Sequence, residues 1–283
     1  MAIPKGASIA SRVRLNQGPE IPWLGLGVFQ SEPGPVTRTA VEWALAAGYR
    51  AVDTAAMYRN ETDVGEAVRA SGLARDDVFV TTKLWFTDRG YEAALKAGRA
   101  SAERLGLGPI DLYLIHWPRA NSPEERLGSW KALTELQREG VCRAIGVSNY
   151  TVRHLEELLA HSDIVPAVDQ VEFHPFVFDP ELLRYCVHHG IRLEAWSPLT
   201  RGRHLDDPTI AAIAAAHHRT PAQVLIRWGL EHGILEIPKS VHETRIRENA
   251  QVFDFSLSES EVRALDALRG GPRVGMWNPT DIP

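Results

Sequence analysis

Short apolar runs alternate with longer amphipathic segments along most of the chain. The runs are rich in β-branched and aromatic residues, and they predict strands over residues 23–29, 50–55, 78–84, 110–117, 142–149, 167–173, 192–198 and 234–238. The segments between them have helical periodicity and predict helices over 35–47, 62–71, 89–105, 124–139, 152–160, 180–189, 208–217, 221–231 and 243–252. Such alternation is typical of parallel strands joined by crossover helices.

Eight strand-and-helix units in about 250 residues fit a single closed (β/α)8 barrel of the TIM type. The alternative is a doubly wound open sheet, whose dinucleotide-binding form would carry G-x-G-x-x-G after its first strand. Gly25-Leu26-Gly27 lacks the third glycine, because Gln30 stands there, so we interpret this pair as close backbone packing. No linker divides the chain, which predicts one domain over residues 1–283. Residues 11–22 predict an additional β-hairpin, and residues 257–268 an extra carboxyl-terminal helix.

Composition and charge narrow the range of partners. The net charge is −5 and like charges do not cluster, which argues against nucleic acid and membrane surfaces and favours a small-molecule substrate. The chain has neither an apolar leader near its start nor a spanning apolar run, so we expect a cytoplasmic protein. Cys142 and Cys186 are isolated and are expected to be reduced core thiols. Adjacent histidines at 188–189 and 217–218 diverge on a helix, so we expect no metal site.

Polar residues close several of the apolar strand runs. Asp53 ends the second predicted strand, Lys83 the third and His116 the fourth, and Tyr58 follows Asp53 in its loop. In (β/α)8 barrels, the carboxyl ends of the strands meet at the face that carries the chemistry. We therefore expect these four side chains to converge in the barrel mouth. Each of them alone would be explained better by a structural role, such as a hydrogen-bonded core histidine for His116.

Longer motifs resemble the aldo-keto reductase family over roughly residues 20 to 260. They comprise GYRAVDTA at 48–55 with Tyr58, Asn60, Glu61 and Gly65, RAIGVSNY at 143–150, and IPKS at 237–240 with Arg245, Glu248 and Asn249. The resemblance implies a barrel enzyme that reduces carbonyl groups by hydride transfer from a nicotinamide cofactor.

The four strand-end residues suit this chemistry, because hydride addition to a carbonyl leaves an alkoxide that needs a proton. Tyr58 would supply that proton. A tyrosine is a weak acid at neutral pH, and we expect the Lys83 ammonium to lower its pKa. Asp53 would keep Lys83 charged, and His116 would orient the carbonyl oxygen.

The resemblance also assigns residues to the cofactor. Ser148, Asn149 and Gln170 would hydrogen-bond the carboxamide of the nicotinamide. Trp196 would stack on its ring, where many relatives carry tyrosine, and Ser197 and Leu199 would extend the same site. The alternative for Trp196 is a core aromatic of the barrel wall.

A basic cluster follows the last predicted strand. Lys239, Ser240 and Arg245 are suited to the 2′-phosphate of NADPH, which favours NADPH over NADH. A solvated helix face is the alternative for this cluster, and it would explain Arg247 better than Arg245. The resemblance places Glu248 and Asn249 in the same cofactor clamp.

Tryptophans near strand ends and in the tail predict an aromatic substrate pocket, formed by Trp23, Trp85, Trp117 and Trp277, although core packing would also explain them. The loops after His116 and Pro198 and the tail are short, which predicts an open mouth. In this respect the chain resembles bacterial reductases of 2,5-diketogluconate and small ketoaldehydes. Arg59, where relatives often carry glycine, would place a charge at the rim and favour acidic sugars.

Two other classes of function remain open from the sequence. Some family members bind the nucleotide and act as regulatory subunits with little turnover, although all four catalytic residue types are present here. A barrel hydrolase or isomerase would need paired acidic residues or metal ligands at the strand ends, and the sequence offers Asp53 no such companion apart from Glu172. The family resemblance also implies a monomer.

Overall fold

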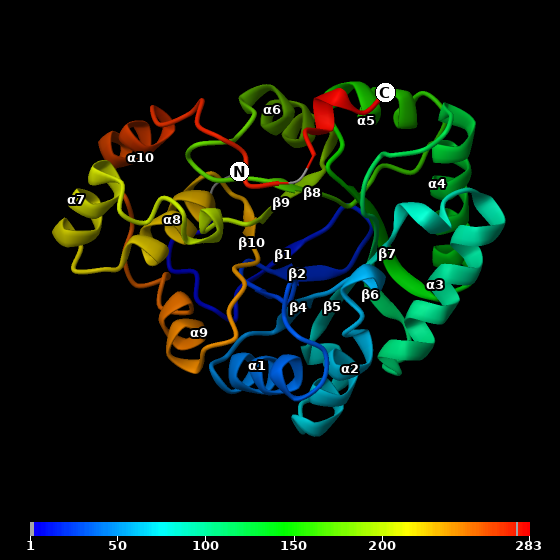
Figure 1. Ribbon diagram of the computed structural model, residues 1–283, viewed down its shortest axis with the longest axis horizontal. Coiled ribbons are helices and arrows are strands. Elements are labelled where there is room, and N and C mark those ends of the chain that lie inside the picture. Colours follow the sequence, from blue (N-terminus) through cyan, green and yellow to red (C-terminus); the bar gives the residue numbers. More distant parts are fainter. Residues whose placement is uncertain (1–2, 276) are drawn as a thin grey trace.

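Eight parallel strands lie at the centre of the computed structural model, which describes residues 3–275 and 277–283 (Figure 1). They occur around the sheet in chain order: β3 (Leu26–Gly27), β4 (Ala51–Asp53), β5 (Phe79–Leu84), β6 (Ile110–Ile115), β7 (Cys142–Ser148), β8 (Val168–Glu172), β9 (Arg192–Trp196) and β10 (Leu235–Glu236). All eight predicted strands are confirmed, and each is shorter than its apolar run.

The first and last strands meet and close the barrel. Parallel bridges join Leu24 to Glu236 and Gly27 to Lys239. The approach is close, because a Cβ on Gly27 would lie only 2.8 Å from the carbonyl oxygen of Ile237. The glycines therefore serve barrel closure, as we interpreted them, and the open doubly wound sheet is excluded.

The helices surround the barrel (Figure 1). They are α1 (Pro35–Ala46), α2 (Glu61–Ala70), α3 (Tyr91–Leu105), α4 (Pro123–Arg138), α5 (Val152–Leu159), α6 (Pro180–His189), α7 (Pro208–Ala216), α8 (Pro221–Glu231), α9 (Glu243–Asn249) and the additional α10 (Glu259–Asp266). Several begin with one local signal, a capping side chain followed by proline, as at Ser122, Asp179, Asp207 and Thr220. No helix of the described residues is long and apolar enough to cross a membrane.

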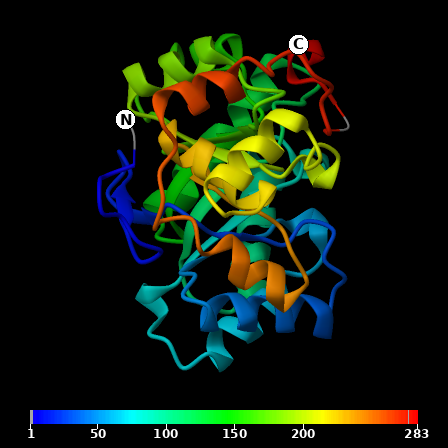
Figure 2. The same ribbon diagram turned by 90° about the vertical axis from the view of Figure 1, so that its left-hand side faces the viewer.

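The predicted hairpin is also present and lies under the barrel. β1 (Arg12–Arg14) pairs with β2 (Glu20–Pro22), and Gln17 at its turn donates hydrogen bonds to the carbonyls of Ile145 and Val165. Figure 2 shows this blue hairpin and the red carboxyl-terminal tail on different sides of the molecule. The hairpin therefore leaves the carboxyl ends of the strands free for the site.

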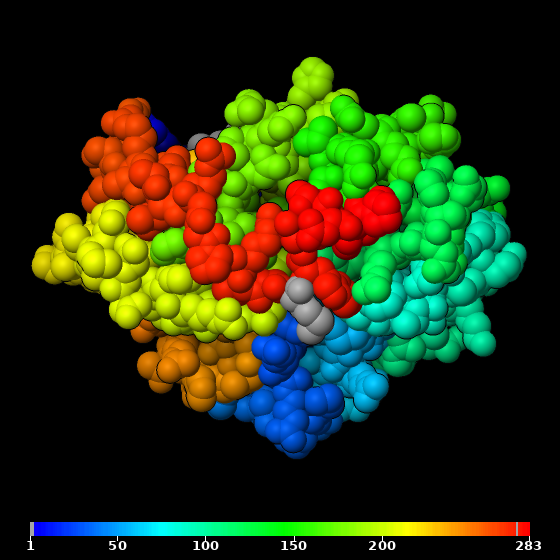
Figure 3. Space-filling view, turned by 45° about the horizontal axis from the view of Figure 1, so that its top comes forward, coloured from blue at the N-terminus to red at the C-terminus, as the bar shows by residue number. Residues whose placement is uncertain are grey.

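The tail after α10 crosses the mouth of the barrel, and Figure 3 shows it in red across this face. Glu172, at the end of β8, holds it there: its Oε1 accepts a 2.5 Å hydrogen bond from the backbone nitrogen of Val274. Further along, Arg126 donates to the carbonyl of Pro283. The tail is short but still covers part of the mouth, which corrects the expectation of an uncovered opening.

Candidate active site

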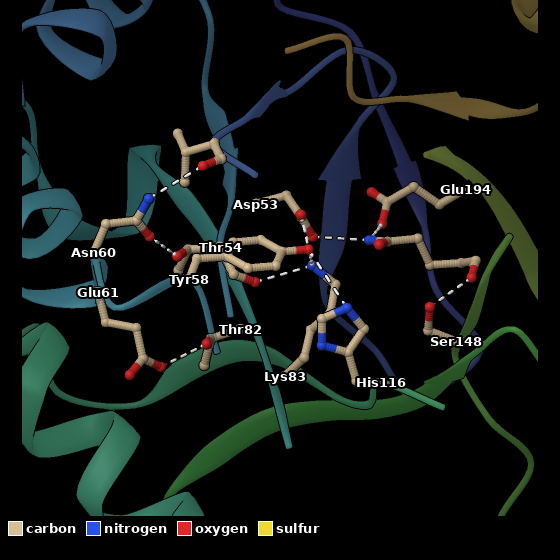
Figure 4. A network of polar contacts seen from close by, with 12 residues as sticks. Asp53, Thr54, Tyr58, Asn60, Glu61, Thr82, Lys83, His116, Ser148 and Glu194 are labelled. Carbon is tan, nitrogen blue, oxygen red and sulfur yellow. Dashed lines mark hydrogen bonds and ion pairs between the residues drawn. The ribbon is translucent and has the colours of Figure 1, made fainter. Parts of the chain in front are cut away.

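The hydroxyl group of Tyr58 is the centre of a polar cluster at three successive strand ends (Figure 4). After β4 ends at Asp53, a 3-10 helix over Ala56–Tyr58 positions the tyrosine. Its hydroxyl oxygen lies 3.5 Å from the Nζ of Lys83 and 3.5 Å from the Nε2 of His116. Lys83 belongs to β5, and His116 directly follows β6. The structure thus brings together all four residues that we expected to converge.

Lys83 and Asp53 form an ion pair inside the barrel. The Nζ of Lys83 lies 2.6 Å from the Oδ1 of Asp53 and 2.9 Å from the carbonyl oxygen of Thr54. Burial lowers the pKa of Lys83, but attraction to Asp53 and Tyr58 outweighs burial and leaves that pKa above its usual value. Burial raises the pKa of Asp53, and Lys83 opposes that rise. Lys83 therefore remains an ammonium group, as expected.

Tyr58 is a protonated phenol in this environment. Burial raises its pKa to about 12, although Lys83 acts in the lowering direction. The expectation of a lowered pKa is therefore wrong in its net sign, because burial outweighs the neighbouring ammonium. The consequence is that Tyr58 carries its proton at neutral pH.

His116 is neutral for the same physical reason. Burial, assisted by repulsion from Lys83, lowers the pKa of His116 well below its usual value. Its Nδ1 is buried and has no hydrogen-bond partner among the described residues. Its ring also lies edge-on to Trp85, with the ring centroids 5.0 Å apart. A neutral imidazole beside the Tyr58 hydroxyl can donate to or accept from a third polar atom placed between them.

A cavity of about 1150 Å³ opens above this cluster. At one end it is aromatic and includes Tyr58 and Trp85. At the other end Lys239 and Arg245 line it, and neither forms an ion pair within the described part of the chain. An elongated ligand with an apolar or aromatic end and an anionic end would satisfy both regions.

Comparison with known proteins decides the family. The model of the aldo/keto reductase family matches residues 24–269. The chain belongs to the aldo/keto reductase family. It is 48% identical to glyoxal reductase of Bacillus subtilis, over 97% of this chain and 98% of that protein. It is 44% identical to morphine 6-dehydrogenase of Pseudomonas putida, over 95% of each chain.

Solved structures of aldo/keto reductases agree with the fold described above. The crystal structure of an aldo/keto reductase from Brucella melitensis matches with a TM-score of 0.88 and 44% identity, covering 92% of this chain and 99% of that one. The aldo/keto reductase of Bombyx mori, solved in complex with NADP, matches with a TM-score of 0.89 and 34% identity, covering 98% and 99%. Members of this family are oxidoreductases that use a nicotinamide cofactor, so the cavity is a candidate dinucleotide site.

The residues expected at the nicotinamide carboxamide lie together at the ends of β7, β8 and β9. Trp196 donates from its Nε1 to the Oδ1 of Asn149 at 2.9 Å, and both line the cavity with Gln170, Ser197 and Leu199. Ser148 differs, because it is fully buried and its hydroxyl donates to the carbonyl of Gln170 at 2.7 Å. Ser148 therefore supports the backbone behind the wall of the cavity.

The residues expected at the phosphate end also line the cavity, namely Lys239, Ser240, Arg245, Glu248 and Asn249. Glu248 is engaged locally, because its Oε1 accepts a 2.7 Å hydrogen bond from the Thr220 hydroxyl at the start of α8. That contact leaves the two cations as donors for an anion, whereas the Ser240 hydroxyl already donates a 3.4 Å hydrogen bond to the carbonyl of His242. The donor set of this end fits a phosphate group.

Three of the four expected pocket tryptophans form the substrate end. Trp277 packs on Trp85 and Trp117, with ring centroids 6.2 Å and 5.2 Å apart. Trp23 is not among the residues that line the cavity and is 2% exposed. It precedes β3 and lies within 6.0 Å of the Arg192 guanidinium at the start of β9, which is the opposite end of the barrel. The assignment of Trp23 to the substrate pocket is therefore wrong.

Sequence reasoning missed Phe29 and Arg201, which line the cavity near Tyr58. The Phe29 ring centroid lies 5.0 Å from that of Tyr58, and the Arg201 guanidinium lies 5.5 Å from the Phe29 centroid. Phe29 closes the first predicted strand, so the strand-end rule could have selected it in place of Trp23. Arg59, in contrast, is exposed and does not line the cavity. The charge expected at the rim from Arg59 is supplied by Arg201.

The acidic residue connected to Asp53 is Glu194 and not the expected Glu172. Glu172 contacts His174 and the tail, and no contact joins it to Asp53 among the described residues. The carboxyl group linked to Asp53 is that of Glu194, through the amide of Gln170. Within the described chain, no group of three or more His, Cys, Asp and Glu side chains is arranged to hold a metal ion.

Proposed function

We propose that this aldo/keto reductase reduces the carbonyl group of small aldehydes, ketones, dicarbonyls or keto sugars with NADPH, and that Tyr58 is the proton donor. The observation that carries the proposal is the position of the Tyr58 hydroxyl, 3.5 Å from both Lys83 and His116 at the floor of the cavity. A carbonyl oxygen there would meet a protonated phenol and a neutral imidazole.

The roles of the residues follow from this arrangement. NADPH, when bound, supplies the hydride to the carbonyl carbon. Tyr58 protonates the oxygen as negative charge develops there, and Lys83 stabilises the phenolate that remains. Asp53 keeps Lys83 charged, and His116 orients the oxygen through a hydrogen bond. The proton therefore moves from the Tyr58 hydroxyl to the product, and the Lys83 ammonium stabilises the negative charge left on the phenolate.

Lys239, Ser240 and Arg245 would hold the 2′-phosphate, with Glu248 and Asn249 beside the adenine. Asn149, Gln170 and Trp196 would hold the nicotinamide, supported by Ser148 and extended by Ser197 and Leu199. The preference for small substrates is supported by the aromatic crowding of Trp85, Trp117 and Trp277 around Tyr58. The relative named glyoxal reductase makes dicarbonyls the first substrates to test.

We further propose a single domain over residues 1–283 that acts as a monomer in the cytoplasm. Both cysteines, Cys142 and Cys186, are free and buried, which is compatible with a reducing compartment. Gel filtration and fractionation of the source cell test these two points.

Consumption of NADPH by the wild type and by Tyr58→Phe tests the main proposal. The substrates are glyoxal, methylglyoxal, small aldehydes and keto sugars, and quenching of tryptophan fluorescence measures cofactor binding. We expect turnover by the wild type and a loss of at least about 10² in Tyr58→Phe with cofactor binding retained. Tight binding without turnover by the wild type would favour a nucleotide-binding regulatory subunit instead.

A further inference from the structure

The side chains of Gln170 and Glu194 meet inside the barrel and connect to Asp53 of the catalytic ion pair. Figure 4 shows Glu194 to one side of Asp53 and Lys83 in this network. The two residues are in register on neighbouring parallel strands, β8 and β9, so their side chains point to the same side of the sheet. The Nε2 of Gln170 lies 2.5 Å from the Oε2 of Glu194 and 2.8 Å from the Oδ2 of Asp53. All three side chains are almost completely buried.

These two contacts determine which way the Gln170 amide faces. Asp53 already accepts a hydrogen bond from Lys83 through Oδ1, so its Oδ2 is also an acceptor oxygen. The atom of Gln170 that contacts two carboxyl oxygens must be the nitrogen, because only the amide nitrogen has two hydrogens to donate. If the amide were turned over, its oxygen would face the Asp53 carboxylate, which has no hydrogen to donate, and that hydrogen bond would be lost. The Oε1 of Gln170 is left without a partner among the described residues.

The polar side chains next to Gln170 also leave an oxygen free to accept a hydrogen bond from a ligand. Both hydrogens of the Asn149 amide are used, one to the carbonyl of His116 at 2.9 Å and one to the Ser148 hydroxyl at 3.0 Å. The Ser148 hydroxyl hydrogen is donated to the backbone of Gln170. The Asn149 Oδ1 accepts one hydrogen bond, from Trp196, and an amide oxygen can accept two. This part of the cavity wall therefore offers acceptors and no unused side-chain amide hydrogen.

We propose that Glu194 is a positioning residue that fixes the amide of Gln170, so that its Oε1 accepts a hydrogen bond from the amino group of the nicotinamide carboxamide. This inference rests on the proposed function, because it concerns the cofactor of that reaction. Beyond that function, Glu194 lies behind the cavity wall and would select for the carboxamide amino group through Gln170. Replacing the carboxamide amino group with a methyl group would leave the amide oxygen unpaired.

Burial supports this role. Together with repulsion from Asp53, it raises the pKa of Glu194 to about 8, so the group is largely uncharged at pH 7. A neutral carboxyl group still accepts a hydrogen bond from Gln170 through its carbonyl oxygen. Glutamine at position 194 would offer the same acceptor without a charge, whereas leucine would offer none. Glu194→Gln is therefore the conservative variant and Glu194→Leu the disruptive one.

The test compares NADPH with its 3-acetylpyridine analogue, in which a methyl group replaces the carboxamide amino group. Dissociation constants for both are measured by fluorescence, together with that of 2′-phospho-ADP-ribose, which lacks the nicotinamide. In the wild type and Glu194→Gln, we expect NADPH to bind more tightly than the analogue. In Glu194→Leu, we expect this preference to fall by about 3- to 10-fold, because one hydrogen bond is lost. The affinity for 2′-phospho-ADP-ribose should not change.

Glu236→Met is the matched control, because it removes another buried carboxyl group, on the next strand, without touching Gln170. It should keep the wild-type preference. If Glu194→Leu does not fold, the smaller Glu194→Thr takes its place. An unchanged preference in the disruptive variant overturns the inference, and so does an equal loss of affinity for 2′-phospho-ADP-ribose. Failure of the wild type to bind NADPH would instead refute the proposed function, so the two failures are distinguishable.

Discussion

Glu236→Met should stabilise the protein, and the gain should grow as the pH rises. Glu236 is 1% exposed, and its Oε2 has no hydrogen-bond partner among the described residues. Its Oε1 packs against α8, where it would lie 1.7 Å from a Cβ on Gly229. Burial, with repulsion from Glu194, raises the pKa of Glu236 well above the usual value for a glutamate. Methionine matches glutamate in length and has no polar oxygen to bury.

The magnitude follows from two contributions. An unpaired buried polar group costs about 1–3 kcal/mol. In addition, the pKa of this carboxyl group is higher in the folded state than in the unfolded state. Protonation of Glu236 therefore contributes its full stabilisation of the folded wild type only below about pH 4.5. This stabilisation is lost as the pH rises toward the folded-state pKa. We therefore expect the free energy of unfolding of Glu236→Met to exceed that of the wild type by about 2 kcal/mol at pH 7, or roughly 4–8 °C in Tm. The difference should be smaller at pH 5.

Thermal and urea unfolding between pH 5 and pH 8 measure this difference. Glu236→Gln cannot ionise but keeps a buried polar group, so it should lose the pH dependence without the full gain. Glu259→Gln, at an exposed helix position, controls for the loss of a carboxylate on the surface. A destabilised Glu236→Met, or a gain that is equal at pH 5 and pH 8, would refute the reasoning.

Three further predictions concern the cavity. Arg245→Ala should raise the Kd for NADPH by about 10-fold or more and leave that for NADH unchanged, because a charged hydrogen bond to the 2′-phosphate is lost; parallel titrations of both cofactors check this, and equal losses would contradict it. Arg201→Met should raise the KM of carboxylated carbonyl substrates at least about 3-fold relative to neutral ones, and an unchanged ratio would exclude Arg201 from substrate recognition. Trp277→Ala should change substrate KM values, whereas Trp23→Phe should lower only Tm, and the reverse pattern would contradict the placement of the two rings.

The fold could be predicted because each barrel strand is a short apolar run, whereas apolar residues recur with helical periodicity in each crossover helix. The carboxyl end of each strand was harder to locate, and Trp23 was wrongly assigned to the substrate pocket for this reason. Trp23 and Phe29 flank the same run, and only the direction of the strand distinguishes the floor of the barrel from its mouth. Phe29 follows the run and lines the cavity, whereas Trp23 precedes it.

The catalytic cluster could be predicted because polar residues at successive strand ends meet at one face. Glu194 could not, because it lies within an apolar run and its contact with Gln170 depends on the register between β8 and β9. The net sign of the Tyr58 pKa shift was also out of reach, since it depends on how deeply the ring is buried. Glu172 is a further case, because its partner in the tail is about one hundred residues away in the chain.

The course of the tail has a practical consequence for handling the protein. Arg126 and His154 contact the carbonyls of Pro283 and Ile282, and Trp277 forms a wall of the substrate end. An affinity tag or fusion partner attached after residue 283 would compete with these contacts beside the mouth. The hairpin side of the barrel carries none of the cavity residues. Purification handles, surface immobilisation and display formats are therefore better attached at the amino-terminal side.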